Sequence, residues 1–393
     1  MACIIFGDAF TFPDGDASTN RVYAYAKGLH ENGMKVSVVC FRNSYLTIPS
    51  GISEGIEYYH PFERRARSKS FFQRRFDSIN KYLNTYFLFL EMRRKEEIFF
   101  ILCYTKAVRT QILAFLLSRI TGSKLILERS EHPFKDYTCN FAKVVLGSLK
   151  IFLEIRFTDY IFCISDYLIE FYKERGAREH LLLKVPSIVD NSRFSKTYTR
   201  PVKARYVCYT GSLTKQKDGV HILIISFSLI ADKHKDISLF LVGRADTLEE
   251  EIYFRDLVAD LGITDRVVFT GKIPRIQIPP YVCNAEALVL ARPKSMVADA
   301  GFPSKLTEYL SSGKPVVVTR VGEIPRYLTN NYNAFLAEPD SSEAFADRLD
   351  YVLTHRKVAQ EVGIKARELA LSIFDSKYQA QQILSFIESN LRK

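Results

Sequence analysis

The sequence predicts an α/β protein built from two tandem, doubly wound domains that face a cleft. Strand-like apolar runs alternate with helix-like segments over the first half of the chain, which is typical of a mostly parallel sheet covered on both faces. A polar, basic stretch at 191–203 has the composition of a linker. The alternation then restarts, so we expect a second domain of similar size, with ligands bound at the carboxyl ends of the strands.

In the first domain, expected at 1–195, the strands are short runs that are apolar almost throughout, as buried parallel strands are. Gly33 ends the first helix, and each later strand is followed by a helical pattern. The expected strands are 2–8, 35–41, 55–62, 98–105, 124–131 and 159–166. The expected helices are 21–32, a long one after residue 62, one between 131 and 159, and two that end near Arg119 and Arg175.

The second domain, expected at 204–374, repeats this alternation and adds two helices at its end. Asp375 is a suitable N-cap for a last amphipathic helix, which we expect to pack back on the first domain over 375–393. The expected strands are 205–212, 237–243, 266–271, 286–292, 315–319 and 333–338, and the two helices are 343–354 and 358–371.

Composition limits the class of protein. The chain has 393 residues, 47% apolar and 25% charged, as ordinary globular proteins have, and its net charge of +11 indicates an acidic partner or ligand. Seven cysteines lie mostly in apolar runs without a CxxC pair, so we expect buried thiols in a reducing compartment. A strand-like run begins at the second residue and no apolar run is long enough to span a bilayer, so a cytoplasmic protein without a signal peptide is expected.

The stretch 299–326, DAGFPSKLTEYLSSGKPVVVTRVGEIPR, is a candidate for a ligand site. Pro303 suits the first turn of a helix and Gly313 its end, and the start of such a helix offers backbone N–H groups to an anion. Lys305 has the wrong sign for the helix dipole, which favours a phosphate there, and Glu308 one turn later can accept hydrogen bonds from a ribose. A solvated Lys305–Glu308 pair is the alternative.

A second anion candidate is YTGSLTKQKDG at 209–219, after the first strand of the second domain. Gly211 permits a tight turn, and Lys217 can reach back over it to a phosphate. The segment is neither a Walker loop nor a G-x-G-x-x-G fingerprint, which disfavours ordinary NTPases and NAD enzymes.

Several motifs, taken together and in order, resemble the retaining glycosyltransferases of the GT-B fold, family 4. The resemblance rests on GSL at 211–213 with KDG at 217–219, on LFLVG, RVVFTGKI and GFPSKLTEYLSSGKPVVVT, and upstream on DYIFCISDYLIEFYKERG and KVPSIVD. It covers most of the chain and implies two Rossmann-like domains. The second would bind a nucleotide-diphosphate sugar donor and the first an acceptor.

The resemblance implies that Lys217 and the start of the helix at Ser304 hold the donor diphosphate and that Glu308 holds the ribose. The first glutamate of the family motif falls on Ala300, and the usual loop arginine is replaced, so these positions depart from the family pattern. Base selection is expected near Gly271–Ile273. The expected donor-binding residues are Gly211, Ser212, Lys217, Gly271, Ile273, Arg292, Asp299, Gly301, Phe302, Ser304, Lys305 and Glu308.

On the acceptor side, the resemblance points to the loop after the first strand, with Gly15 and Asp16, and to the segment 128–134 at a strand end. His132 and Glu131 are the catalytic candidates there, beside Lys217, which would stabilise the leaving diphosphate. An ordinary loop histidine is an equally good interpretation of His132.

The implied activity is transfer of a sugar to a glycan or lipid-linked acceptor with retention of configuration, and without a metal or other cofactor, in surface polysaccharide or glycolipid synthesis. Alternatives are a sugar-nucleotide epimerase of the same fold and a non-catalytic nucleotide-sugar-binding partner, the latter favoured by Ala300. Only the net charge suggests nucleic acid, which is not expected as a partner.

A basic and aromatic stretch, FERRARSKSFFQRRF at 62–76, contains six basic residues and one acid. It continues into a helical pattern with apolar residues at Phe72, Phe76, Ile79, Leu83, Tyr86 and Leu90. This combination indicates contact with an anionic membrane surface, which would make the protein peripheral on the cytoplasmic face. The alternative is a solvated loop followed by a helix that buries its apolar stripe in the domain core.

Overall fold

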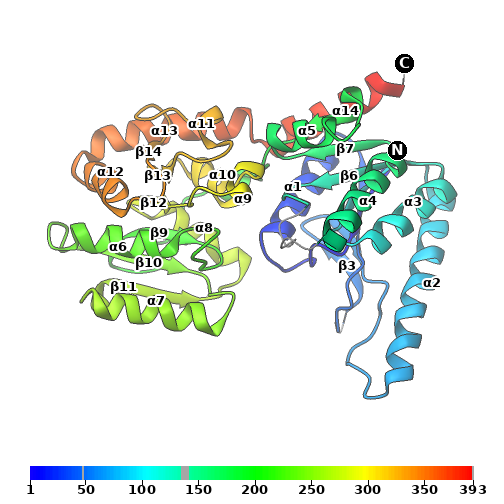
Figure 1. Ribbon diagram of the computed structural model, residues 1–393, viewed down its shortest axis with the longest axis horizontal. Helices are drawn as coiled ribbons and strands as arrows, with labels where there is room; N and C mark the ends of the chain where they lie inside the picture. Colours follow the sequence, from blue (N-terminus) through cyan, green and yellow to red (C-terminus); the bar gives the residue numbers. More distant parts are fainter. Residues whose placement is uncertain (47, 134–140, 392–393) are drawn as a thin grey trace. The chain divides into compact units, whose positions relative to one another are not determined.

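The computed structural model describes residues 1–46, 48–133 and 141–391, and the chain forms two compact units (Figure 1). The first unit contains Met1–Pro186 and Ser376–Lys393, and the second contains Ser187–Asp375. The first boundary therefore lies at residue 186 and not at 195, because the segment after β8 packs in the second unit. The basic stretch 191–203 is part of that second unit.

The first unit is built on an eight-stranded sheet in the order β3-β4-β2-β1-β5-β6-β7-β8. All neighbouring strands are parallel except β3, which pairs antiparallel with β4 in a hairpin that the sequence did not indicate, because β3 is short and polar. The strands are β1 Ala2–Gly7, β2 Lys35–Cys40, β3 Ser50–Ser53, β4 Ile56–Tyr59, β5 Ile98–Tyr104, β6 Lys124–Arg129, β7 Tyr160–Cys163 and β8 Leu182–Lys184.

The helices of the first unit include two groups of neighbours. The last helix, α14, lies along α1, whereas α2, α3 and α4 lie next to one another in the order of the chain (Figure 1). The helices are α1 Ala17–Glu31, α2 Phe71–Lys95, α3 Val108–Thr121, α4 Phe141–Phe157, α5 Asp166–Lys173 and α14 Ser376–Leu391, with a 3₁₀ turn at Glu179–Leu181.

The second unit has a six-stranded, fully parallel sheet in the order β11-β10-β9-β12-β13-β14. Its strands are β9 Arg205–Thr210, β10 Ile237–Val242, β11 Val267–Gly271, β12 Ala287–Leu290, β13 Val316–Thr319 and β14 Phe335–Ala337. Its helices are α6 Val220–Ala231, α7 Leu248–Asp260, α8 Ile278–Cys283, α9 Met296–Ala300, α10 Ser304–Ser312, α11 Ile324–Tyr327, α12 Ser342–Thr354 and α13 Arg356–Ser372. Short 3₁₀ turns lie at Asn191–Arg193, Thr264–Arg266 and Arg275–Gln277.

The strands are apolar because most of them are covered on both faces, and nearly all residues of β1, β2, β7, β12 and β13 are buried. The cysteines follow the same rule. Those at positions 3, 40, 103, 163 and 208 are buried free thiols, Cys283 is half-buried, and Cys139 lies outside the described residues. Burial raises the pKa of the Cys40 and Cys283 thiols to about 11, which keeps them protonated at neutral pH. Over the described ranges, no helix combines the length and hydropathy needed to cross a bilayer.

Candidate functional site

The candidate donor site lies in the second unit, where the loop after β9 meets the start of α10. Gly211 has a φ of 127°, which favours glycine, and a Cβ at this position would lie 2.5 Å from the Lys305 ammonium. The structure therefore brings together Gly211 and Lys305, which are far apart in the sequence, at the carboxyl end of the central strand of the sheet.

Lys305 is held in place by two partners. Its Nζ donates to Asp218 Oδ2 at 2.9 Å and to the Tyr209 hydroxyl at 2.5 Å, and it lies 4.2 Å from the centre of the Tyr209 ring. The Lys305 side chain is 14% exposed and that of Asp218 only 6%. The Tyr209 hydroxyl also lies 2.6 Å from the Ser212 carbonyl oxygen, which links the cluster to the turn. Lys305 is thus a buried, oriented cation and not one half of a solvated pair with Glu308.

Three cationic side chains act on the Asp218 carboxylate, and of these Lys305 contacts it directly. Burial raises the pKa of Asp218, but the positive charges of Lys305, Arg292 and Lys217 outweigh it and hold that pKa below its usual value. Burial lowers the pKa of Lys305, Asp218 opposes this effect, and Lys217 and Arg292 lower the pKa further. The side chain of Arg292 is buried, and its Nε donates to the Lys217 carbonyl oxygen at 3.3 Å. The cluster has two more positive than negative charges, which suits a polyanion.

The start of α10 faces the same region of the second unit. Within the part of the chain that the structure describes, no side chain caps the first turn at Ser304, so the backbone N–H groups there can bind an anion. The preceding residues anchor this turn. Phe302 is buried against Tyr327 and Phe374, with ring centres 5.5 and 5.3 Å apart, and Gly301 is buried as well. The packing of Phe302 therefore positions α10, and its ring is part of the core.

Glu308 lies one turn further along α10, and its Oε1 accepts a hydrogen bond from Arg193 Nη1 at 3.0 Å. Arg193 also donates to the Arg275 carbonyl oxygen at 3.3 Å, just after the segment where base selection is expected. Of that segment, Gly271 has a φ of 69° with open space around it, and Ile273 is half-buried. The ribose and base candidates are therefore linked through Arg193, a residue of the stretch interpreted as a linker.

The family glutamate position is filled by a fully buried alanine, Ala300, in the short helix α9. Asp299 beside it is half-buried, and its backbone N–H donates to the Ser295 carbonyl oxygen. Ser212, at the position of the usual loop arginine, is exposed, and Lys305 and Arg292 supply positive charge nearby.

The catalytic candidates in the first unit differ in environment. His132 is buried and packs on the rings of Tyr167 and Phe171, with centres 5.7 and 5.1 Å away. Glu131 forms an ion pair with Lys106 at 2.5 Å. Of the loop residues after β1, Gly15 is half-buried and Asp16 occupies the exposed N-cap position of α1. The His132 environment is mainly that of a packed aromatic ring.

The comparisons with known proteins agree with this geometry. Residues 190–369 match the family model described as Glycosyl transferases group 1. The second unit is a group 1 glycosyl transferase domain. The family named from the sequence motifs is thus confirmed at this level, and the match covers nearly all of that unit.

Relatives and solved structures extend the similarity to both units. The chain is 26% identical to mannosylfructose-phosphate synthase of Agrobacterium fabrum, over 57% of this chain and half of that protein. It is 24% identical to N-acetyl-alpha-D-glucosaminyl L-malate synthase of Bacillus anthracis, over 72% of each. The structure of Anabaena Alr3699/HepE in complex with UDP superposes with a TM-score of 0.70 at 17% identity, over 99% of this chain and 100% of that one. The predicted GT-B fold is confirmed.

Sequence reasoning missed three residues of the glycosyl transferase domain that organise its site, namely Tyr209, Asp218 and Arg193. Asp218 follows Lys217 in the KDG motif. A negative charge at that position could have indicated a partner for one of the lysines of the site. Tyr209 lies inside an apolar strand run, and Arg193 lies in a basic stretch. Nothing in the local pattern distinguishes either of them from its neighbours.

Two buried ion pairs at the end of β6 in the first unit were also missed. Arg21 donates to Glu128 at 2.7 Å and to the carbonyl oxygens of Val185 and Pro186. Arg129 pairs with Glu154 at 2.5 Å. Glu128 and Arg129 therefore have a structural role. Their ion pairs connect β6 with α1 and α4, and Arg21 also connects it with the end of the first unit.

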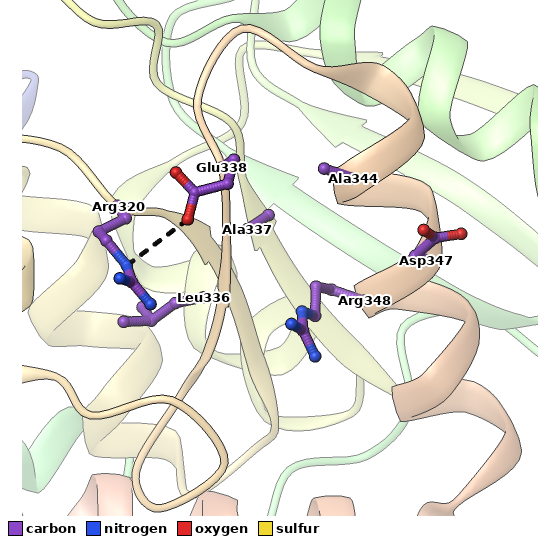
Figure 2. Close-up of a pocket in the computed structure, with 7 residues that line it drawn as sticks. All are labelled: Arg320, Leu336, Ala337, Glu338, Ala344, Asp347 and Arg348. Carbon is purple, nitrogen blue, oxygen red and sulfur yellow. Dashed lines mark ion pairs between the residues drawn. The ribbon is translucent and has the colours of Figure 1, made fainter.

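A surface hollow of the second unit, between the end of β14 and α12, is lined by Arg320, Leu336, Ala337, Glu338, Ala344, Asp347 and Arg348 (Figure 2). Arg320 and Glu338 form an ion pair at 3.9 Å across it, and their side chains are 50% and 69% exposed. None of the expected donor residues lines this hollow, and its charges of both signs do not favour an anion.

The environment of His132 predicts a pH effect. Burial, and then the nearby Arg175 charge, lower the pKa of His132, so the folded protein favours the neutral ring. The stabilisation of the folded protein by the neutral ring is complete above the pKa of about 6.5 in the unfolded state. It is lost as the pH falls through the lower pKa of the folded state. As the pH is lowered from about 7 to about 5, the unaltered protein should lose this stabilisation and His132→Phe should not. We therefore expect the free energy of unfolding of His132→Phe, measured with urea, to rise relative to that of the unaltered protein by up to about 1 kcal/mol. A constant difference across this range would contradict the assignment.

Proposed function

We propose that the protein transfers a sugar from a nucleotide-diphosphate donor to a glycan or lipid-linked acceptor, with retention of configuration, in surface polysaccharide or glycolipid synthesis. The observation that carries this proposal is the Lys305–Asp218 ion pair at 2.9 Å beside the start of α10, with Arg292 and Lys217 near enough for their charges to lower the pKa of Asp218. A diphosphate bound there would neutralise the surplus positive charge. The family of the second unit supports the reaction class.

The mechanism follows from charge. As the glycosidic bond to the donor breaks, negative charge grows on the departing phosphate oxygen, and oriented cations stabilise it most where water is excluded. Lys305 is such a cation because Asp218 and Tyr209 fix its position before any ligand binds. The departing phosphate oxygen would accept the proton of the acceptor hydroxyl, so we propose that no separate protein base and no metal are needed. Glu308 would bind the ribose and share its carboxylate with Arg193.

The first unit would bind the acceptor near Asp16 and His132, with Glu131 beside it. The proposal gives His132 the role of a neutral hydrogen-bonding ring near the transferred sugar, since its lowered pKa favours the neutral form. The ring packs on Tyr167 and Phe171, and these contacts hold it in place.

The test is the replacement of Lys217 by alanine. Its side chain is exposed, so the fold and the melting temperature should stay unchanged, whereas sugar transfer should fall by about 10²–10³-fold, as for loss of one charge-stabilising donor. UDP- and GDP-sugars serve as donors, with released nucleotide as the readout and nucleoside diphosphates screened by thermal shift.

Lys215→Ala is the matched control, because Lys215 belongs to the same loop but lies against the Tyr253 ring, with Nζ 4.5 Å from its centre. This variant should transfer normally. Equal activity in Lys217→Ala and the unaltered protein would remove the phosphate assignment.

A non-catalytic nucleotide-sugar-binding role is the second candidate, and it is favoured by the buried Ala300 in place of a carboxylate. Nucleotide binding with no nucleotide release in the presence of glycan or lipid-linked acceptors would support this second role over transfer.

A further inference from the structure

Helix α2 turns its polar side toward the protein and its apolar side outward. The buried positions recur every four residues and are Asp77, Lys81, Thr85 and Phe89, of which three are polar. The opposite side is exposed and apolar, with exposed fractions of 82, 59, 58, 50 and 62% for Phe72, Phe76, Ile79, Leu83 and Phe87. The interpretation of this stripe as part of the core is therefore wrong. An ordinary surface helix shows the reverse arrangement.

Specific bonds fix this orientation of α2. Asp77 pairs with Arg64 at 2.6 Å and accepts a hydrogen bond from Ser68 at 3.0 Å. Lys81 donates to Asn43 Oδ1 at 2.7 Å, with its ammonium 3.9 Å from the centre of the Phe41 ring. Rotating the helix to bury its aromatic side would break these bonds. The outward apolar side is thus a stable feature of the folded unit.

The neighbouring helices continue the same surface. On α4, the buried Glu154 pairs with Arg129, while Leu146, Leu149 and Phe152 are 62, 52 and 60% exposed. Since α2, α3 and α4 lie next to one another, their outer sides form one surface of the first unit, with α2 the longest (Figure 1). We call it the outer helical face, made of Phe72, Phe76, Ile79, Leu83 and Phe87 of α2, Ile112 and Leu116 of α3, and Leu146, Leu149 and Phe152 of α4.

Basic side chains lie at the start of α2 and along α3. Arg65, Arg67, Lys69 and Arg75 are exposed, and the segment 62–76 contains a single acid. The Arg75 guanidinium lies 5.1 Å from the centre of the Phe71 ring. Arg109 and Arg119 are exposed on the same side of α3 as Ile112 and Leu116. Cations beside exposed aromatic side chains are the composition of segments that lie in the headgroup region of a membrane.

We propose that the outer helical face docks on the surface of a bilayer that contains anionic lipid, with its apolar side chains inserted at the headgroup boundary and its basic side chains on the lipid phosphates. Charge complementarity selects this occupant over a second copy of the chain, because two copies joined through this face would bring two basic segments together. The surface belongs to the first unit, so its docking can be measured without the donor site and without transfer activity.

The experiment is co-sedimentation of the full chain with two kinds of vesicle. One is phosphatidylcholine alone, and the other contains about 30 mol% of the anionic lipid phosphatidylglycerol. We expect much tighter binding to the anionic vesicles, and high salt should weaken it to the level seen on phosphatidylcholine alone, because apolar insertion is not screened. Phe72→Ser/Phe76→Ser should lower the partition coefficient by at least about tenfold at any salt concentration. Arg65→Glu/Arg67→Glu should lower it about tenfold or more at low salt only.

Each variant has a matched control on the second unit. Leu248→Ser/Ile252→Ser removes two exposed apolar side chains of α7, and Lys235→Glu/Lys357→Glu reverses two exposed charges. Both controls should bind vesicles as the unaltered chain does. Absence of vesicle binding, or equal losses in controls and variants, would overturn the proposal. So would a dimer in sedimentation velocity that Phe72→Ser/Phe76→Ser dissociates while vesicles remain unbound, since the occupant would then be a second copy.

Discussion

Replacing Lys305 with methionine is expected to lower sugar transfer by about 10²–10³-fold and to destabilise the second unit by about 3 kcal/mol. The two effects have different origins. Transfer falls because a fixed cation beside the departing phosphate is lost. Stability falls because the Asp218 carboxylate, whose side chain is only 6% exposed, keeps its charge without the ammonium at 2.9 Å. Initial rates and urea unfolding measure the two separately.

The double variant Lys305→Met/Asp218→Asn separates the role in folding from the role in binding. Removing both charges should restore most of the stability, to within about 1 kcal/mol, because no uncompensated charge remains buried. Transfer should stay as low as in Lys305→Met. If the double variant regains full transfer, Lys305 acts only through the structure of the loop.

The second large effect is expected at a buried ion pair of the first unit, between Arg21 and Glu128. Both side chains are almost fully buried, at 4% and 0% exposure, and Arg21 also donates to two carbonyl oxygens at the end of the first unit. Arg21→Met should therefore destabilise that unit by about 3–5 kcal/mol, measured by urea unfolding. Adding Glu128→Gln should recover part of this loss. A change below about 1 kcal/mol in Arg21→Met would show that the pair contributes little.

The sequence was sufficient for the elements that repeat a pattern. Apolar runs such as ACIIFG and VVVT predicted buried parallel strands, and the order of the glycine and lysine motifs predicted the family. These features are encoded in local composition and in spacing along the chain, so a single sequence is enough to find them.

The rest depends on contacts between distant residues, which composition does not encode. The partner of Lys305 is Asp218, and that of Glu308 is Arg193, more than one hundred residues earlier. The sequence left the orientation of α2 open for a related reason. Its apolar stripe at Phe72 and Phe76 has the spacing of a core face, and only the bonds of Asp77 and Lys81 show which side faces inward. Periodicity predicts that a helix has two faces but does not say which one is buried.

The path of the chain has a consequence for the order of folding during synthesis. Helix α14 belongs to the first unit, where the Ser376 carbonyl oxygen approaches Gly28 so closely that a Cβ there would lie 2.1 Å from it. A nascent chain emerges from the ribosome with its amino terminus first. The first unit is therefore translated early, but α14, which covers α1, is added only at the end of synthesis. The second unit is complete at residue 375 and can close earlier. Removing the last eighteen residues should therefore damage the half of the protein that is encoded at the opposite end of its gene.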